Sequence, residues 1–295
     1  MAGLLDVQNS GAKRFRQLLS GTEAVVAPGA YDALSARLIE SAGFPTVYMT
    51  GFGVSASMLG RPDVGLTTMS EMVDSARRMV QAVSVPVIAD ADTGYGNALN
   101  VVRTVREYEA AGVAGIQLED QMAPKRCGHM TGRLLVAAAE MEGKIRAAVT
   151  ARRSSDLVII ARTDAREVEG IDHAIERARR YRDAGADMLF VEAPQTIGEV
   201  ETIARELAGT PLLFNWAEGG KTPPISLHEL QELGFRLVIF PVGALLAATA
   251  AVQRILDVIK ADGTPQRGLD AVTPFRDFLE LIGLPEIDEM GKRFA

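Results

Sequence analysis

The chain has 295 residues, of which 47% are hydrophobic and 23% are charged, and its formal net charge is −7. This composition is typical of a folded globular protein and excludes a disordered chain. The acidic balance, with no run of lysine or arginine, argues against nucleic-acid binding. We therefore expect no nucleic-acid partner, and an acidic substrate would need a local positive pocket.

Cys127 is the only cysteine, so no disulfide can form within the chain, and this usage is typical of a reducing compartment. Residues 1–20 lack the apolar core of a signal peptide, and no stretch of 18 uninterrupted apolar residues occurs. We therefore expect a soluble cytoplasmic protein that does not contact a membrane.

A short helix over residues 12–19 is followed by eight apolar runs that alternate with amphipathic segments of helical period. Near-continuous apolar runs of this length are typical of parallel strands buried on both faces. Glycines at positions 43, 112, 185 and 234 follow four of the amphipathic segments, where a helix C-cap favours glycine. The predicted strands are Ala24–Pro28, Thr46–Gly51, Val85–Asp92, Gly115–Asp120, Val158–Asp164, Met188–Ala193, Leu212–Trp216 and Leu237–Val242.

Eight strand–helix units predict an α/β fold, a single (β/α)8 TIM barrel that spans residues 1–295. A doubly wound open sheet is the alternative, but no G-x-G-x-x-G motif follows the first strand. After the last unit, a Gly/Pro-rich link over 263–268 leads to helical segments at 274–282 and 286–293. This C-terminal helical tail, residues 264–295, must pack on its own barrel or on a neighbouring subunit.

Polar residues follow five successive predicted strands, at the end of a barrel where catalytic groups lie. Asp90 and Asp92 are two residues apart, so a strand directs them to one face, where a cation would relieve their repulsion. With Glu119 and water they suit a hard divalent ion such as Mg²⁺, although either aspartate could instead cap the next turn. Arg162, Glu192 and Asn215 end the next three strands.

The loop after the fourth strand contains a lid motif, Lys125-Arg126-Cys127-Gly128-His129. A thiol beside cations is expected to have a lowered pKa and to be reactive, whereas a lone cysteine is otherwise a small buried hydrophobe. Gly128 and Gly132 would let the loop bend and close over a substrate as a lid. Its cations would add the positive charge that a polycarboxylate requires.

Three further sites are weaker in signal. Thr50-Gly51-Phe52-Gly53 follows the second strand, and its glycines would let backbone amides approach an anion. Asp63 is either a second partner of the metal or a turn former. Trp216 would line the pocket or the core, and His173 and His228 are expected at the surface.

These motifs together resemble the isocitrate lyase and phosphoenolpyruvate mutase superfamily over nearly the whole chain. The resemblance is to the branch that holds methylisocitrate lyases, 2,3-dimethylmalate lyases, petal death protein and carboxyphosphonoenolpyruvate phosphonomutases. The segments that carry it are 28–35, 50–56, 90–96, 118–121, the lid motif at 125–129, 161–165, Glu192-Ala193 and 218–223.

The resemblance implies a role for each matching residue. Asp90, Asp92 and Glu119, with Asp63 nearby, would hold Mg²⁺, or Mn²⁺ in its place. A 2-oxo- or 2-hydroxycarboxylate would bind the amides of Thr50, Gly51 and Phe52, with Gly128 and Arg162 on its oxygens and Glu192 and Asn215 at its far end. Cys127 would protonate the departing carbanion, Tyr48 would act as base, and Lys125, Arg126 and His129 would complete the catalytic lid. The resemblance also implies a homotetramer in which the C-terminal helix is swapped between subunits.

Three activities fit this resemblance. The favoured one is a Mg²⁺-dependent carbon–carbon lyase for a 2-alkylmalate such as 2,3-dimethylmalate, or for 2-methylisocitrate. Met130-Thr131-Gly132 stands where methylisocitrate lyases usually carry arginine and proline, which weakens the case for a third substrate carboxylate. The others are a hydrolase that converts oxaloacetate to oxalate and acetate, and a carboxyphosphonoenolpyruvate phosphonomutase.

Two other classes of protein are conceivable. A metabolite-binding barrel without turnover would not require Cys127 or Asp92. An enzyme that uses Cys127 as a covalent nucleophile would lose its intermediate in Cys127→Ser, whereas a lyase would keep metal and substrate binding.

Overall fold

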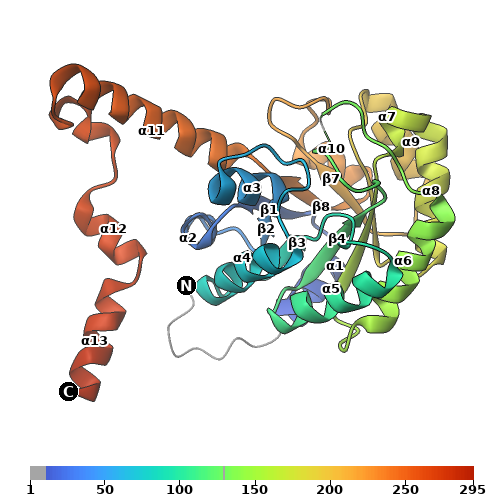
Figure 1. Cartoon of the computed structure of the whole chain (residues 1–295), viewed down its shortest axis with the longest axis horizontal. Coiled ribbons are helices and arrows are strands. Elements are labelled where there is room, and N and C mark those ends of the chain that lie inside the picture. The colour runs from blue at the N-terminus through green and yellow to red at the C-terminus, as the bar shows by residue number, and fades with distance from the viewer. Residues whose placement is uncertain (1–10, 129) are drawn as a thin grey trace.

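The computed structural model describes residues 11–128 and 130–295. Eight parallel strands close into a barrel in chain order, and helices surround it (Figure 1). The first and last strands pair directly, with Val25 beside Leu237. This closure confirms the predicted (β/α)8 barrel and excludes the open sheet. The strands are β1 Val25–Ala30, β2 Val47–Met49, β3 Val87–Asp90, β4 Gly115–Glu119, β5 Val158–Thr163, β6 Met188–Val191, β7 Leu212–Asn215 and β8 Phe235–Phe240.

The helices begin at residues that satisfy their first amides. Asp32, Thr68 and Ser226 each accept a hydrogen bond from the amide three residues on, and these caps fix where α2, α4 and α10 start. The helices are α1 Gly11–Ser20, α2 Ala33–Ser41, α3 Gly51–Leu59, α4 Met69–Ala82, α5 Ala98–Ala110, α6 Ala138–Ala151, α7 Ala165–Glu169, α8 Ile171–Asp183, α9 Ile197–Glu206, α10 Leu227–Glu232, α11 Gly243–Asp262, α12 Phe275–Leu281 and α13 Leu284–Phe294.

Alternation along each strand divides the core into two clusters. On β5, Val158 and Ile160 belong to the cluster inside the barrel, whereas Ile159 and Ala161 pack between the sheet and the helices. Continued by one step, the same alternation turns Arg162 into the barrel at its C-terminal end. The strands therefore decide which polar residues can meet there.

Helix α1 closes the opposite, N-terminal end of the barrel. Phe15 is fully buried and belongs to the interior cluster, beside the start of β4 at Gly115. Arg16 holds the helix in place by donating to the carbonyls of Ser155, Asp156 and Leu157. The predicted helix over 12–19 is thus confirmed, and it acts as the plug of the barrel.

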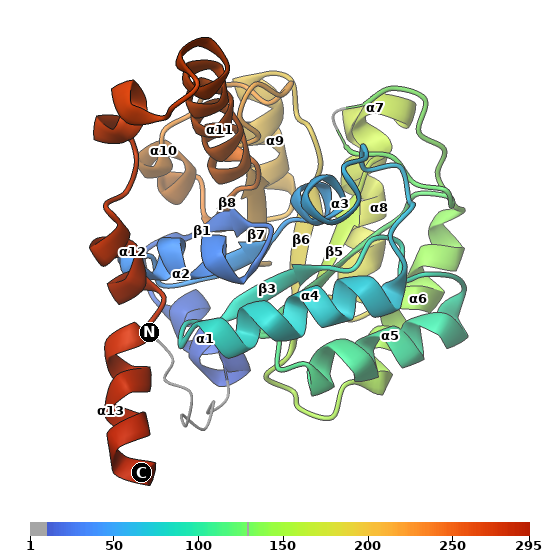
Figure 2. The same ribbon diagram turned by 60° about the vertical axis from the view of Figure 1, so that its left-hand side comes forward.

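The C-terminal tail leaves the barrel along α11 and returns past α2 through α12 and α13 (Figures 1 and 2). The predicted link begins at Gly263, which ends α11 in the left-handed conformation, and continues as a 3₁₀ helix, η1, Gln266–Ala271. No residue of the described segment 243–295 is buried. None of the described helices is both long and apolar enough to cross a bilayer.

Candidate active site

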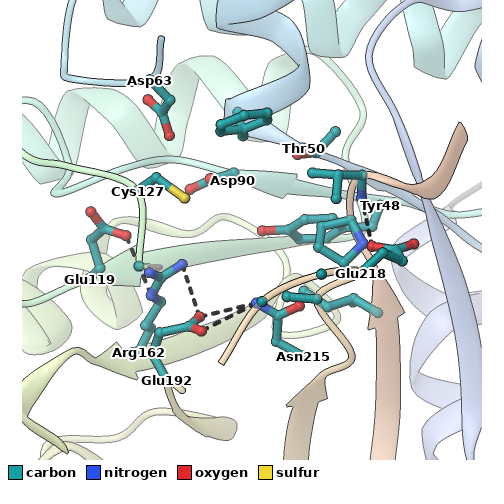
Figure 3. Close-up of a pocket in the computed structure, with 18 of the residues that line it drawn as sticks. Tyr48, Thr50, Asp63, Asp90, Glu119, Cys127, Arg162, Glu192, Asn215 and Glu218 are labelled. Carbon is teal, nitrogen blue, oxygen red and sulfur yellow. Dashed lines mark hydrogen bonds and ion pairs between the residues drawn. The ribbon is translucent and has the colours of Figure 1, made fainter. Parts of the chain in front are cut away.

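Inward-facing side chains from the C-terminal ends of successive strands line one cavity of about 260 Å³ (Figure 3). Four of them follow a member of the interior cluster by two positions, as Arg162 follows Ile160 and Asp90 follows Ile88. The sequence named all of them as site residues, and the structure brings them together. They are Tyr48, Asp90, Glu119, Arg162, Glu192 and Asn215.

One side of the cavity is acidic and centres on Lys125. The Lys125 Nζ lies 2.6 Å from the Asp63 Oδ2 and 2.6 Å from the Asp92 Oδ1, and all three side chains are buried. Asp90 lies beside them and accepts a hydrogen bond from the amide of Asp92. The lid motif therefore places a cation among the carboxylates that the sequence assigned to a metal.

Burial governs the protonation of this cluster. It raises the pKa of Asp90 and Glu119, and it raises that of Asp92 to about 6, with Lys125 opposing the shift and Asp90 adding to it. Burial lowers the pKa of Lys125, but Asp92 and the other carboxylates outweigh it and leave that pKa well above its ordinary value. The buried carboxylates on this side of the cavity thus carry more negative charge than Lys125 alone can neutralise.

This acidic side has the character of a site for a hard cation. The Glu119 Oε1 is buried with no hydrogen-bond partner among the described residues, so one ligand oxygen remains unsatisfied. Within the described chain, no three His, Cys, Asp or Glu side chains converge closely enough to hold an ion by themselves. The arrangement therefore fits Mg²⁺ or Mn²⁺ held by few carboxylates and several waters.

Arg162 is the central cation of the other side. Its Nη2 donates to Asp164 Oδ1 at 2.9 Å, and its guanidinium lies 3.4 Å from both Glu119 Oε2 and Glu192 Oε2. The ring of Phe190 lies 5.2 Å below it. A guanidinium held by three carboxylates has a fixed position and can present its remaining donors to substrate oxygens.

Glu192 and Asn215 form a pair at the far end of the cavity. Asn215 Nδ2 donates to both oxygens of Glu192, at 3.3 and 3.2 Å. Both side chains are buried, and Figure 3 shows the pair joined to Arg162. The pair therefore offers fixed polar groups to one end of a small acid.

The sequence analysis assigned no role to Asp120 or Asp164. Alternation turns Asp120 away from the cavity and toward the helices, where it accepts from Thr163 Oγ1 at 2.7 Å and from Tyr181 Oη at 2.7 Å. Asp120 also accepts a hydrogen bond from the amide of Asp164 at 2.9 Å. This bond fixes the turn after β5, from which the Asp164 carboxylate contacts Arg162. Strand parity could have predicted the direction of Asp120, but not its partners.

Tyr48 lines the cavity, but its surroundings do not suit a base. Its hydroxyl donates to Gln117 Oε1 at 3.1 Å. Burial, reinforced by the neighbouring Asp90, raises its pKa well above the ordinary value. A phenol that holds its proton so firmly is a donor of a hydrogen bond, and the geometry argues against the base that the resemblance implied.

The segment at 50–53 forms the start of α3, where the sequence predicted only a glycine-rich turn. Thr50 is the N-cap, and its own amide donates to the Ala30 carbonyl, so it cannot serve a substrate as predicted. The amides of Gly51 and Phe52, in the first turn, have no carbonyl within the helix to bond. A Cβ on Gly51 would lie 2.5 Å from Asp90 Oδ2, so glycine is needed there.

The described part of the lid loop, residues 120–128 and 130–137 between β4 and α6, packs over the cavity through Lys125, Cys127 and Gly128. A Cβ on Gly128 would lie 2.3 Å from Arg162 Nη2, which shows how closely the loop approaches the floor of the site. The Cys127 amide donates to the Asp63 carbonyl at 3.2 Å, and Figure 3 shows its sulfur among the cavity residues. The structure thus presents the only thiol to the space that a substrate would occupy.

Some residues named from the sequence lie elsewhere. Arg126 is exposed and donates to Thr131 O within its own loop, so it does not line the cavity. His129 lies outside the described residues. Trp216 stacks on Phe240 and donates to Ile225 O, which places it in the packing rather than in the pocket. His173 and His228 are exposed, as predicted.

The remaining wall of the cavity is mostly apolar. It is contributed by the loop after β7, by β8 and by the first turn of α11, opposite the carboxylates. Its one charged side chain within the described chain is Glu218, whose carboxylate accepts from the amides of Val242 and Gly243 at 3.2 and 2.8 Å. Among the described lining residues, Lys125 and Arg162 are the only cations, and both already contact carboxylates. The apolar residues of this wall are Ala217, Ile239, Pro241, Val242 and Leu246.

Comparison with known proteins identifies one family model and several similar enzymes. Residues 15–260 match the family model described as phosphoenolpyruvate phosphomutase. The chain is 51% identical to a 2,3-dimethylmalate lyase of Eubacterium barkeri, over 96% of this chain and 98% of that protein.

Solved structures show the same likeness. A crystal structure of 2,3-dimethylmalate lyase superposes with a TM-score of 0.92 at 42% identity, over 98% of this chain and 97% of that one. Oxaloacetate acetylhydrolase bound to 3,3-difluorooxalacetate gives 0.91 at 42% identity, over 97% and 98%. Phosphonopyruvate hydrolase in complex with oxalate and Mg²⁺ gives 0.89 at 31% identity, over 97% and 99%.

Proposed function

The chain belongs to the phosphoenolpyruvate phosphomutase family, and we propose that it is a Mg²⁺-dependent lyase that cleaves a 2-alkylmalate such as 2,3-dimethylmalate. Its relatives named as lyases, with 51% identity to one of them, support a carbon–carbon lyase of the isocitrate lyase and phosphoenolpyruvate mutase superfamily, and the alkylmalate is the finer choice. The products would be pyruvate and propionate.

The choice of an alkylmalate rests on the separation between the polar side of the cavity, with Arg162, and its mostly apolar wall. A dicarboxylate with methyl groups would turn its acid groups to Arg162 and the amides of Gly51 and Phe52, and its methyl groups to the apolar wall. A third carboxylate would face that wall with no uncommitted cation among the described lining residues, and burying an unpaired charge there would be unfavourable.

The cleavage requires two proton transfers: one proton leaves the C2 hydroxyl of the substrate, and another proton is added to C3. The C2 hydroxyl passes its proton to Glu119, a buried carboxylate with a raised pKa and an Oε1 that has no hydrogen-bond partner among the described residues. The C2–C3 bond breaks, and its electron pair stays on C3 beside the departing carboxylate. Cys127 donates a proton to C3 as the general acid. The Tyr48 hydroxyl would turn from Gln117 to donate its one hydrogen bond to a substrate oxygen, and Arg162 stabilises the charge that develops on the carboxylate.

The acidic side would hold the metal. Asp90, Asp92 and Glu119 would be its nearest carboxylates, some through water, and Asp63 would hold Lys125 beside them. When bound, Mg²⁺ would supply Lewis-acid stabilisation of the negative charge on the C2 oxygen. Closure of the lid loop over the substrate would exclude water, which would strengthen these interactions and protect the carbanion.

The assay is an NMR time course of the purified protein with Mg²⁺ on 2,3-dimethylmalate, 2-methylisocitrate and oxaloacetate in parallel. We expect pyruvate and propionate from the first and little turnover of the second. Pyruvate and succinate from methylisocitrate alone would overturn the substrate choice. Addition of EDTA should abolish the activity and excess Mg²⁺ should restore it.

Oxaloacetate hydrolysis is the second candidate, because the acetylhydrolase structure is as similar in sequence as the lyase structure. Oxalate and acetate formed from oxaloacetate, without cleavage of either hydroxy acid, would make the enzyme that hydrolase. Inactivity on all three acids would instead favour the phosphonomutase.

We further propose a homotetramer in which the tail is swapped between subunits, with the enzyme in the cytoplasm. The tail supports the first part, because its helices expose apolar side chains that a neighbour would cover, including Leu256, Phe275 and Ile287. The single thiol Cys127 supports the second. Truncation after Asp262 should convert a tetramer to smaller species in light scattering, whereas an unchanged mass would contradict the swap.

A further inference from the structure

Five side chains of alternating charge run from the floor of the site to its rim. Arg162 contacts Asp164, Asp164 contacts Arg133, Arg133 contacts Glu167, and Glu167 contacts Lys221. The nitrogen-to-oxygen distances are 2.9 Å from Arg162 to Asp164, 2.5 Å from Arg133 to Asp164 and 2.9 Å from Lys221 to Glu167. The chain of ion pairs links the loops after β4, β5 and β7.

Arg133 is the member that belongs to the lid loop. It begins the return stem of that loop, residues 133–137, which pairs with the outgoing stem where the Met122 amide donates to Leu134 O at 2.7 Å. Gly132, just before it, has a φ of 80°, which gives the chain the bend between tip and stem. Arg133 therefore stands where the tip of the lid loop meets its hydrogen-bonded stem.

The burial of Arg133 is unusual for a residue so close to a loop tip. Its side chain is 1% exposed, and that of Asp164 is fully buried. Its two terminal nitrogens reach two carboxylates on different elements, Asp164 after β5 and Glu167 on α7. A planar guanidinium can span two acceptors in this way, whereas an ammonium is a single point of charge.

Asp164 is shared by the two arginines. Its Oδ1 accepts from Arg133 Nη1 and from Arg162 Nη2, so the lid loop and the floor of the site use one carboxylate. Closing the loop completes the coordination of that carboxylate, and opening it would leave Asp164 buried with Arg162 as its remaining side-chain partner among these contacts. Burying a charge with fewer partners is unfavourable, so the shared contact favours the closed loop.

We propose that Arg133 is a positioning residue that latches the lid loop closed by bridging Asp164 and Glu167. Lys221 extends the latch to the loop after β7 through Glu167. The latch does not touch the reacting atoms, and it acts by holding Cys127 and Gly128 over the cavity. It deepens the proposed function and rests on it only in so far as closure serves that reaction.

The only cysteine reports on the latch without any substrate. Cys127 lies in the lid loop, is half-buried and faces the cavity, so a neutral alkylating reagent should reach it faster when the loop opens. The probe is iodoacetamide, and the readout is the mass increase of the intact protein over time at 25 °C. In Arg133→Met we expect alkylation to accelerate about tenfold, as the loss of one buried charged contact implies.

Further variants separate a latch from general loosening. Glu167→Gln and Lys221→Met should accelerate alkylation about threefold, and Arg133→Met/Glu167→Gln should be no faster than Arg133→Met alone, because the residues act as one unit. Arg133→Lys should recover part of the protection. The matched control is Arg152→Met, which breaks the 2.5 Å contact with Asp187 at the opposite end of the barrel and should leave alkylation unchanged.

The outcomes decide the proposal independently of the substrate. Equal alkylation rates in folded Arg133→Met and the wild type would overturn it, as would equal acceleration in Arg152→Met. If Arg133→Met does not fold, unchanged protection in Lys221→Met and Glu167→Gln would overturn it. Mg²⁺ with oxalate should protect Cys127 in every variant, and failure of that protection would contradict the assumption that the thiol lies in the site. None of these results depends on which acid is cleaved.

Discussion

The two ends of the barrel differ in how their charged side chains are buried and paired. At the N-terminal end, Arg16 lies at the edge of the plug, 32% exposed, and each of its contacts is to a carbonyl or to Asp187. At the C-terminal end, Asp90, Asp92 and Glu119 are buried together, and Glu119 keeps an oxygen with no hydrogen-bond partner among the described residues. The same strands connect both ends.

This contrast separates stability from chemistry within one scaffold. A closed barrel is stabilised by its interior cluster and by α1, so the C-terminal rim can carry groups that weaken the fold. Substitutions at the rim should therefore change activity with little loss of stability, or even a gain. Substitutions at the plug should do the reverse.

The largest expected effect is at the rim, in Cys127→Ser. Loss of the general acid should lower the rate of cleavage by about 10²- to 10⁴-fold, measured as pyruvate formation from 2,3-dimethylmalate. The unfolding temperature and the binding of Mg²⁺ with oxalate should stay near those of the wild type. A trapped covalent adduct in the wild type that is absent from Cys127→Ser would instead make the thiol a nucleophile.

The next effect is at the plug, in Phe15→Ala. Phe15 is fully buried in the interior cluster, so its truncation leaves a cavity and should lower the free energy of unfolding by about 3–5 kcal/mol. Urea unfolding measures this loss. Below the transition, the folded variant should keep the turnover of the wild type, and a large fall in its rate would break the separation between the two ends.

The sequence predicted the parts of the structure that depend on local pattern. All eight strands overlap the predicted apolar runs. The spacing of Asp90 and Asp92 predicted one strand face for both, but β3 ends at Asp90, and Asp92 lies in the following turn with a φ of 48°. The sequence did not reveal α3, because Gly51 and Gly53 are poor helix formers, and close packing against Asp90 and Tyr31 decides their identity.

Local sequence patterns could not predict ion pairs between residues that are distant in the sequence. Lys125 was assigned to substrate, yet its ammonium is drawn to Asp63 and Asp92 by charge that only the folded chain assembles. Arg133 drew no attention because nothing in its neighbourhood in the sequence foretells Asp164, which comes from another loop. Pattern predicted where side chains point, and tertiary packing determined what they meet.

A smaller effect, of opposite sign, is expected from Asp92→Asn in EDTA. The folded state raises the pKa of Asp92 from 3.8 to about 6, so it favours the protonated form. The wild type should therefore lose stability as the pH rises from about 4 to 6.5, on the order of 2 kcal/mol, and the asparagine variant should not. Thermal unfolding at a series of pH values measures the difference between the two proteins.

Mg²⁺ provides the control for this comparison. Bound metal should stabilise the wild type near pH 7 and should stabilise Asp92→Asn much less, because a ligand that binds only the folded state raises its stability. Parallel pH profiles of the two proteins in EDTA would show that Asp92 does not strain the fold, and the contrast between the two ends would then be weaker than the structure implies.

The smallest effect tests the same contrast at the plug, where removal of charge should cost stability. Arg16→Met keeps most of the apolar stem but removes the donors to Ser155, Asp156 and Leu157 and the 2.9 Å contact with Asp187. Since the side chain is about one third exposed, water replaces part of these contacts, and the loss should be about 1–2 kcal/mol in urea unfolding. Arg14→Met on the same helix is the matched control, because exposed Arg14 makes a single 3.3 Å hydrogen bond to Ser84 O and its substitution should change stability by less than about 0.5 kcal/mol.

Neither substitution should alter Mg²⁺ affinity or turnover, since the interior cluster separates both residues from the cavity. A fall in metal affinity in Arg16→Met, with stability unchanged, would mean that the two ends are coupled through the strands.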